Sequence, residues 1–103
     1  MLIAKTNFNY SNGEVVTFKL ITGEEIISRI IEDRTETYIL NKPMSLLNTA
    51  NGGLGMMPIP IAGDSKDPIV LNKHAVAIHT RCEQELASQY LEKTTGLTIA
   101  KSF

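Results

Sequence analysis

The predicted fold rests on the segment VVTFKLITGEEIISRIIE, residues 15–32. Its first half places a large apolar side chain at every second position from Val16 to Leu20, which is the alternation of a half-covered β-strand. Thr22 and Gly23 then supply a tight turn, because glycine adopts positive φ without a Cβ clash. The sequence therefore predicts a β-hairpin with one buried face.

The second half of this stretch is apolar on both strand faces. Residues 26–31 read IISRII, so only Ser28 and Arg29 interrupt the apolar run, and such a strand is covered on both sides. Ser28 falls between Ile26 and Ile30 on one face, where a small side chain lets the strand bend over the core. A small barrel requires bends of this kind.

Length, composition and charge indicate one small globular domain. The chain has 103 residues, of which 43% are hydrophobic and 20% are charged. The net charge of −1 lacks the basic surplus of proteins that hold nucleic acid by phosphate contacts alone, so any such site must be local. A single cysteine, Cys82, excludes an internal disulfide, and no signal or membrane-spanning run is recognisable. We expect a cytoplasmic protein, in the host cytoplasm if a phage encodes it.

Two further strands are expected in the middle of the chain. Residues 37–40 form a third strand, which Pro43 ends because proline cannot donate to the ladder. Residues 54–61 form a fourth strand, in which Pro58 and Pro60 remove donors from the same edge. This fourth strand can therefore pair properly on one edge only.

A last pair of strands and a helix complete the expected order. The polar tripeptide 72–74 separates a short strand at 69–71 from a final strand, or a kinked continuation, at 75–79. Thr80 and Glu83 have the spacing of a capping box, and apolar residues then repeat every four positions up to Gly96, a C-cap. Cys82 belongs to this apolar stripe, which favours a buried structural thiol over a reactive one.

Two aromatic residues, Phe8 and Tyr10, precede the first strand. They could stack on bases, or they could close the open end of a barrel. Closing the barrel is favoured, because no basic residue except Lys5 accompanies them.

The pattern Leu20-x-x-Gly23-x-x-Ile26-x-Ser28-x-Ile30 resembles the first sequence motif of the Sm/LSm family of RNA-binding proteins. The two strands around residues 72–74 resemble the second motif of that family, and the likeness is greatest to small phage-encoded members. It implies a mainly β fold: a small, strongly bent, five-stranded SH3-like barrel over about residues 14–79, with one C-terminal helix over about 81–94.

Three departures from the family pattern limit what the resemblance implies. The first-motif loop usually offers an Asp, an aromatic residue and an Asn, whereas residues 33–38 read DRTETY and contain no Asn. The second motif usually carries an Arg-Gly pair, which residues 72–74 replace with Asn-Lys-His. The helix usually precedes the barrel. A preference for uridine is therefore not implied.

The resemblance implies a homo-oligomeric ring of roughly five to seven copies, in which the edge of one fourth strand pairs with the fifth strand of the next copy. We expect the subunit interface to consist of apolar side chains on these strands, namely Met57, Ile59, Ile61, Val76 and Ile78.

In such a ring, the loops at 34–38 and 72–74 of every copy converge on a pore that binds single-stranded RNA or DNA, with a role in RNA or DNA processing. Tyr38 or His74 stacks on a base, Asn72 reads a base edge, and Lys73 and Arg34 meet phosphate. The alternative for each of these residues is a solvated turn, or a core position in the case of Tyr38.

The competing function is a structural or adaptor barrel that assembles a phage particle and binds no nucleic acid. An enzyme is disfavoured, and no metal or cofactor is expected. His74 and His79 lie five residues apart and so face opposite sides of a strand, which gives neither a metal pair nor a catalytic dyad. The glycines at 52–55 lack the lysine and the following helix of a phosphate-binding loop.

Overall fold

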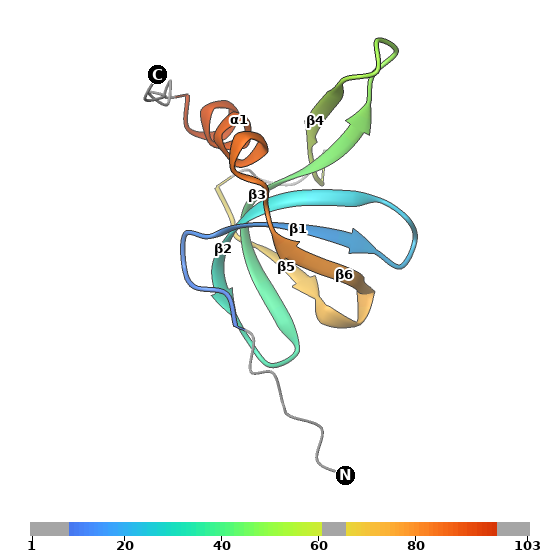
Figure 1. Cartoon of the computed structure of the whole chain (residues 1–103). Coiled ribbons are helices and arrows are strands. Elements are labelled where there is room, and N and C mark those ends of the chain that lie inside the picture. The colour runs from blue at the N-terminus through green and yellow to red at the C-terminus, as the bar shows by residue number, and fades with distance from the viewer. Residues whose placement is uncertain (1–8, 61–65, 97–103) are drawn as a thin grey trace.

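The computed structural model of the chain describes residues 9–60 and 66–96. In these residues, one sheet of six antiparallel strands is followed by one helix (Figure 1). The elements are β1 (Val15–Leu20), β2 (Glu25–Asp33), β3 (Thr37–Asn48), β4 (Leu54–Pro58), β5 (Ile69–Asn72), β6 (Val76–Arg81) and α1 (Gln84–Thr95). The expected mainly β fold with a C-terminal helix is confirmed, with six strands in place of five. No helix in this part of the chain has the length and apolar character needed to cross a bilayer.

The strands are ordered β4-β3-β2-β1-β6, and β5 also pairs with β3. Because β2 occupies one edge of β3, strands β4 and β5 lie end to end along the other edge, at residues 44–48 and 37–40 of β3. Strand β6 pairs with the free edge of β1. A short 3-10 helix, Lys73–Ala75, joins β5 to β6 and so connects the β3 side of the sheet to the β1 side.

The β1–β2 hairpin forms where the sequence predicts it. Gly23 has φ +103°, and its N–H donates to the carbonyl of Leu20 at 2.9 Å. The N–H of Leu20 donates in turn to the carbonyl of Glu24 at 2.8 Å. Val16 and Phe18, the apolar side chains of the alternating half, are fully buried.

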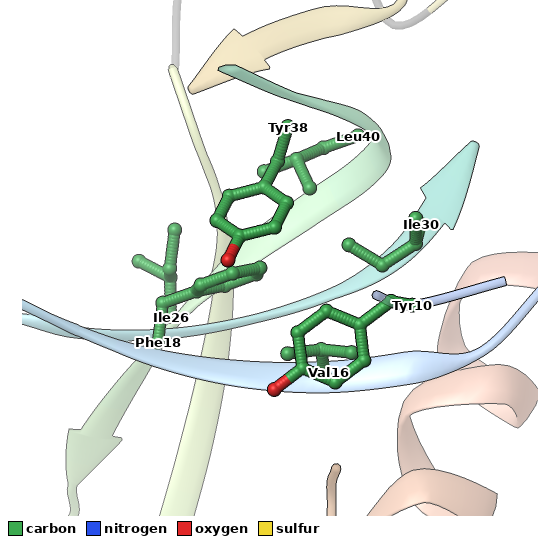
Figure 2. Close-up of a cluster of buried hydrophobic side chains, with 7 residues drawn as sticks. All are labelled: Tyr10, Val16, Phe18, Ile26, Ile30, Tyr38 and Leu40. Carbon is green, nitrogen blue, oxygen red and sulfur yellow. The ribbon is translucent and has the colours of Figure 1, made fainter. Parts of the chain in front are cut away.

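Each face of the sheet carries its own apolar cluster. The first cluster lies on one face of the sheet (Figure 2) and consists of Tyr10, Val16, Phe18, Ile26, Ile30, Tyr38 and Leu40. The second lies on the opposite face, where Tyr90 of α1 packs on Ile27 and Met44. Strand β2 therefore contributes to both clusters, as the run IISRII predicts. Tyr10 is part of the core, and Phe8 lies outside the described residues.

Strand β3 continues through Pro43, so the prediction that Pro43 ends the third strand is wrong. The ladder between β2 and β3 shifts register between Ile27 and Arg29, opposite residues 41–44. Lys42, immediately before the proline, has φ +52°. This irregularity allows a residue without an N–H to remain inside a strand, because proline is tolerated at a bulge.

Strand β4 is shorter than predicted, because it ends at Pro58. The N–H of Ile59 then donates to the carbonyl of Pro43 at 3.1 Å, and the peptide bond between Ile59 and Pro60 is cis. Ile61 lies outside the described residues. The β3–β4 hairpin extends away from the rest of the sheet (Figure 1).

Helix α1 begins later than the capping box predicts. Thr80 belongs to β6, and Glu83 is the N-cap residue. The Glu83 carboxylate accepts the N–H groups of Glu85 at 3.0 Å and Leu86 at 3.2 Å. The predicted C-cap is confirmed, because Gly96 has φ +71° and donates its N–H to the carbonyl of Glu92.

Candidate functional site

The loop between β2 and β3 packs against the turn between β5 and β6. Thr37 pairs with Asn72 in the β3–β5 ladder, and the N–H of Lys73 donates to the carbonyl of Glu36 at 2.9 Å. Backbone pairing therefore brings the two loops of the sequence hypothesis to one end of the sheet within a single protomer. We call residues 32–36 and 72–74 the loop surface.

Lys73 is the most constrained cation of the loop surface. Its Nζ lies 2.6 Å from Oδ1 of Asp33, a carboxylate only 3% exposed, and 4.6 Å from the ring centroid of Tyr38. The other carboxylate oxygen of Asp33 accepts the N–H of Tyr10 at 2.9 Å. Because removing Lys73 would leave a buried carboxylate without its counter-charge, we assign Lys73 a structural role.

Arg34 and His74 each make an exposed contact with a carboxylate. Nε of Arg34 lies 2.8 Å from Oε2 of Glu32, and Nε2 of His74 lies 3.1 Å from Oε2 of Glu36. The side chains of Arg34 and His74 are 59% and 80% exposed. Solvent-exposed pairs of this kind contribute only about 0–1 kcal/mol, so a phosphate could replace either carboxylate at little cost.

Tyr38 is a core residue and offers no surface on which a base could stack. Its ring is buried beside Phe18, with 5.0 Å between the ring centroids. Burial, followed by the nearby charge of Asp33, raises the pKa of Tyr38 to about 12. Of the two stacking candidates, only His74 remains exposed.

Asn72 orders the turn between β5 and β6. Its side-chain oxygen accepts the N–H of His74 at 2.9 Å and so caps the short 3-10 helix. This contact constrains the backbone at His74.

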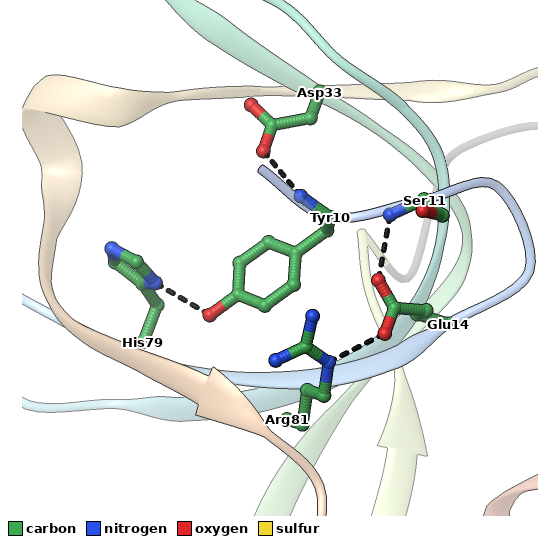
Figure 3. Close-up of polar contacts among 6 residues, drawn as sticks. All are labelled: Tyr10, Ser11, Glu14, Asp33, His79 and Arg81. Atoms are coloured by element: carbon green, nitrogen blue, oxygen red, sulfur yellow. Dashed lines mark hydrogen bonds and ion pairs between the residues drawn. The ribbon is translucent and has the colours of Figure 1, made fainter. Parts of the chain in front are cut away.

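A polar network next to the loop surface was not foreseen from the sequence (Figure 3). The hydroxyl of Tyr10 lies 2.6 Å from Nδ1 of His79, and Nε of Arg81 lies 2.5 Å from Oε1 of Glu14. Through Asp33, the same network continues to Lys73. The network connects the segment before β1 to β2 and β6. Local sequence spacing could not predict it, because its partners are up to 69 residues apart.

The loop surface is not strongly basic. Three carboxylates, those of Glu32, Asp33 and Glu36, accompany the cations Arg34 and Lys73, and His74 adds a charge only when it is protonated. Three negative and two fixed positive charges leave a local charge of −1 with a neutral imidazole. The loop surface of a single protomer therefore attracts phosphate only weakly.

The expected interface residues divide into exposed and core-packed side chains. Met57 on β4 and Ile78 on β6 are exposed, and Ile78 is 60% accessible. Ile59 and Val76 pack against the first apolar cluster, so they contribute to the protomer itself. Ile61 lies outside the described residues.

Val70 is an exposed edge residue that the sequence hypothesis missed. It is 62% exposed on β5, whereas its neighbours Ile69 and Leu71 pack against the first apolar cluster. Successive side chains of a strand point to opposite faces. The run Ile69-Val70-Leu71 could therefore have indicated that Val70 is exposed when its two neighbours are buried.

A cleft of about 350 Å³ lies between the start of α1 and the β3–β4 hairpin. Its apolar wall consists of Leu46, Leu54, Cys82 and Leu86, with Glu25 and Glu83 among its polar residues. Burial, followed by the charge of Glu83, raises the pKa of the Cys82 thiol to about 11. This half-buried thiol precedes α1 and has the character of a packing residue.

Among the described residues, no group of three or more His, Cys, Asp or Glu side chains could hold a metal ion. The sequence matches no model of a known protein family, and no curated protein is significantly similar to it.

Proposed function

We propose that the chain is an Sm-like, SH3-like barrel whose copies assemble into a ring and bind single-stranded RNA or DNA. The connectivity supports the barrel: β5 pairs with β3, β6 pairs with β1, and the 3-10 helix Lys73–Ala75 joins them. The pattern from Leu20 to Ile30 supports the family, and its Ser28 is buried beside a shift in the β2–β3 register. The proposal includes no catalytic step.

In this ring, the edge formed by β4 and β5 of one protomer pairs with the edge of β6 in the next. Within the described residues each of these strands pairs with a single neighbour, which leaves one edge of each unpaired. Met57, Val70 and Ile78 are exposed apolar residues on these three strands. Head-to-tail contacts of this kind close by rotation into a ring of roughly five to seven copies.

The nucleic acid contacts the loop surfaces that the ring repeats around its axis. Arg34 exchanges Glu32 for a phosphate, and the exposed imidazole of His74 stacks on a base. Asn72 sets the position of His74, and Lys73 holds the two loops together. Repetition of Arg34 around the axis provides the multivalent contact that one protomer lacks.

The observation that carries this function is the exposure of Arg34 and His74 on two loops that are joined by backbone pairing. It is tested by fluorescence anisotropy with labelled single-stranded dT and rU oligonucleotides at two salt concentrations. We expect Arg34→Ala and His74→Ala each to weaken binding by about tenfold or more in the ring, and added salt to weaken it further. Lys19→Ala is the matched control, because Lys19 is an exposed cation on β1 outside the loop surface. Unchanged affinity in both loop variants would contradict the proposal.

A second candidate is a structural or adaptor barrel that forms the same ring and binds no nucleic acid. The charge balance favours it, because both fixed cations of the loop surface, Arg34 and Lys73, lie within 2.8 Å of a carboxylate. Retention on heparin separates the two candidates. An adaptor elutes in low salt, whereas a nucleic-acid-binding ring is retained until added salt displaces its phosphate contacts.

A further inference from the structure

Two cations, Arg29 and Lys42, lie on the face of the sheet that α1 covers. Neither has a carboxylate partner within residues 9–60 and 66–96. They lie where the β2–β3 ladder shifts register, under the C-terminal half of α1. Arg34 and Lys73 of the loop surface are paired with carboxylates, whereas the positive charges of Arg29 and Lys42 are not neutralised in this way.

The irregular backbone of β3 brings both cations to the same face. Arg29 pairs with Asn41, and in a regular strand the next residue, Lys42, would point to the other face. At φ +52° Lys42 departs from this alternation, and its Nζ reaches the carbonyl of Thr94 in α1 at 2.9 Å. Arg29 meets α1 as well, because its backbone N–H donates to the hydroxyl of Tyr90.

The guanidinium of Arg29 is incompletely satisfied. Its Nε is buried and has no hydrogen-bond acceptor. Arginine stays charged in proteins, and burying part of a charged donor without an acceptor is unfavourable. Lys42 also retains donor capacity, because an ammonium group has three N–H bonds and Thr94 accepts one of them. An anion between these side chains would provide the missing counter-charge.

We propose that Arg29 and Lys42 form a binding site for a phosphate group at the junction of β2, β3 and α1. The Nε–H and one terminal N–H of Arg29 donate to two phosphate oxygens, and Lys42 supplies the second positive charge. The phosphate comes either from free inorganic phosphate or from a polynucleotide backbone. In the second case the site rests on the proposed function and adds a contact on the face remote from the loop surface.

The first arm of the test uses inorganic phosphate at constant ionic strength, monitored by ¹H–¹⁵N NMR of the full chain. The Nε–H signal of Arg29 reports on the site directly. We expect a saturable shift of this signal, and about tenfold weaker binding in Lys42→Asn, since asparagine tolerates the positive φ while removing the cation. Lys19→Asn is the matched control and should bind as the natural chain does. The absence of a saturable shift, or equal weakening in both variants, would overturn the site.

Arg29→Lys is the second variant, because it keeps the charge and loses the planar pair of donors. We expect it to weaken phosphate binding while the remaining NMR spectrum stays that of a folded chain; unchanged binding would also overturn the site.

The second arm repeats the titration with a single-stranded oligonucleotide. Phosphate binding without oligonucleotide binding would support the site and identify free phosphate as its ligand, while the proposed function would fail. Oligonucleotide binding that depends on Arg34 but not on Lys42, with no phosphate binding, would overturn the site and leave the proposed function standing. Loss of oligonucleotide affinity in Lys42→Asn would identify the polynucleotide backbone as the source.

Discussion

The hydroxyl of Tyr90 lies 3.0 Å from the backbone nitrogen of Arg29, at the point where the β2–β3 ladder changes register. The same hydroxyl lies 2.8 Å from the carbonyl oxygens of Asn41 and Lys42. A side chain of α1 thus satisfies backbone groups at the irregularity in the ladder. The helix therefore stabilises the β2–β3 irregularity as well as covering the second apolar cluster.

Tyr90→Phe should destabilise the chain by about 1–3 kcal/mol, because it leaves the N–H of Arg29 and the carbonyl of Lys42 without this partner. Tyr10→Phe is the matched control. Tyr10→Phe also removes a phenolic oxygen, but the partner of that oxygen is Nδ1 of His79, an exposed residue of β6. A loss of only about 0.5–1.5 kcal/mol is therefore expected. Urea unfolding followed by circular dichroism measures both. A loss in Tyr90→Phe no larger than in Tyr10→Phe would contradict the proposed role of the hydroxyl.

Lys73→Met should lower stability by about 1–3 kcal/mol, because Asp33 is almost fully buried and would lose its counter-charge. Arg34→Met, which breaks an exposed pair, should cost less than about 1 kcal/mol. Thermal unfolding of both variants tests the comparison. The double variant Asp33→Asn with Lys73→Met should be more stable than Lys73→Met alone, since no uncompensated charge remains. Equal effects of Lys73→Met and Arg34→Met would show that Lys73 has no special structural role.

The thiol of Cys82 should react slowly with iodoacetamide at pH 8. With a pKa of about 11, only about one thiol in a thousand is ionised at that pH, whereas an ordinary cysteine with a pKa near 8.5 is roughly a quarter ionised. The rate should therefore rise at least about 100-fold when urea unfolds the chain. A rate in the folded chain within tenfold of the unfolded rate would contradict the burial of the thiol.

The same shift gives stability a defined pH dependence. Between about pH 8.5 and 11 the unfolded chain loses the Cys82 proton while the folded chain keeps it, so the stability of the natural chain falls as the pH rises through this window. Cys82→Ala should remove the part of the decline between pH 8.5 and 10. A decline due to the raised pKa of Tyr38 should persist in that variant at higher pH.

Local patterns predicted most of the elements, because alternation and turn glycines act over a few residues. The β1–β2 hairpin, the doubly buried β2 and the Gly96 cap all follow from such patterns. Pro43 misled the prediction, because its place inside β3 depends on the nonlocal ladder with β2. Thr80 misled it too, because pairing with Thr17 in β1 keeps Thr80 in a strand and leaves Glu83 to cap the helix.

The candidate site was only partly predictable. The convergence of the two loops was expected only from the family resemblance, and within the protomer it results from the nonlocal pairing of β3 with β5. The pairing of Lys73 with Asp33 joins residues 40 positions apart, and the burial of Tyr38 depends on packing against Phe18 of β1, so no local pattern encodes either contact. The Tyr10–His79 contact spans 69 positions and was missed for the same reason.

A charge placed on either edge of the sheet should prevent assembly. Val70→Lys alters β5 and Ile78→Lys alters β6, and both natural side chains are largely exposed, so neither change should unfold the protomer. We expect both variants to sediment as monomers at micromolar concentration, where the natural chain sediments as a ring. Ile21→Lys is the matched control, because Ile21 is an exposed apolar residue in the β1–β2 turn and does not belong to β5 or β6. A control that dissociates as completely would point to a general effect of added charge.

Mixing the two edge variants distinguishes a head-to-tail contact from a symmetric one. Val70→Lys retains the natural edge of β6, and Ile78→Lys retains the natural edge of β5. In a head-to-tail ring these two intact edges complement each other once, so the mixture should form a one-to-one dimer that cannot grow, while each variant alone stays monomeric. A symmetric contact between two copies of β6 would instead let Val70→Lys dimerise by itself. Analytical ultracentrifugation of each variant and of their mixture separates these outcomes, and self-association of either variant alone would overturn the head-to-tail arrangement.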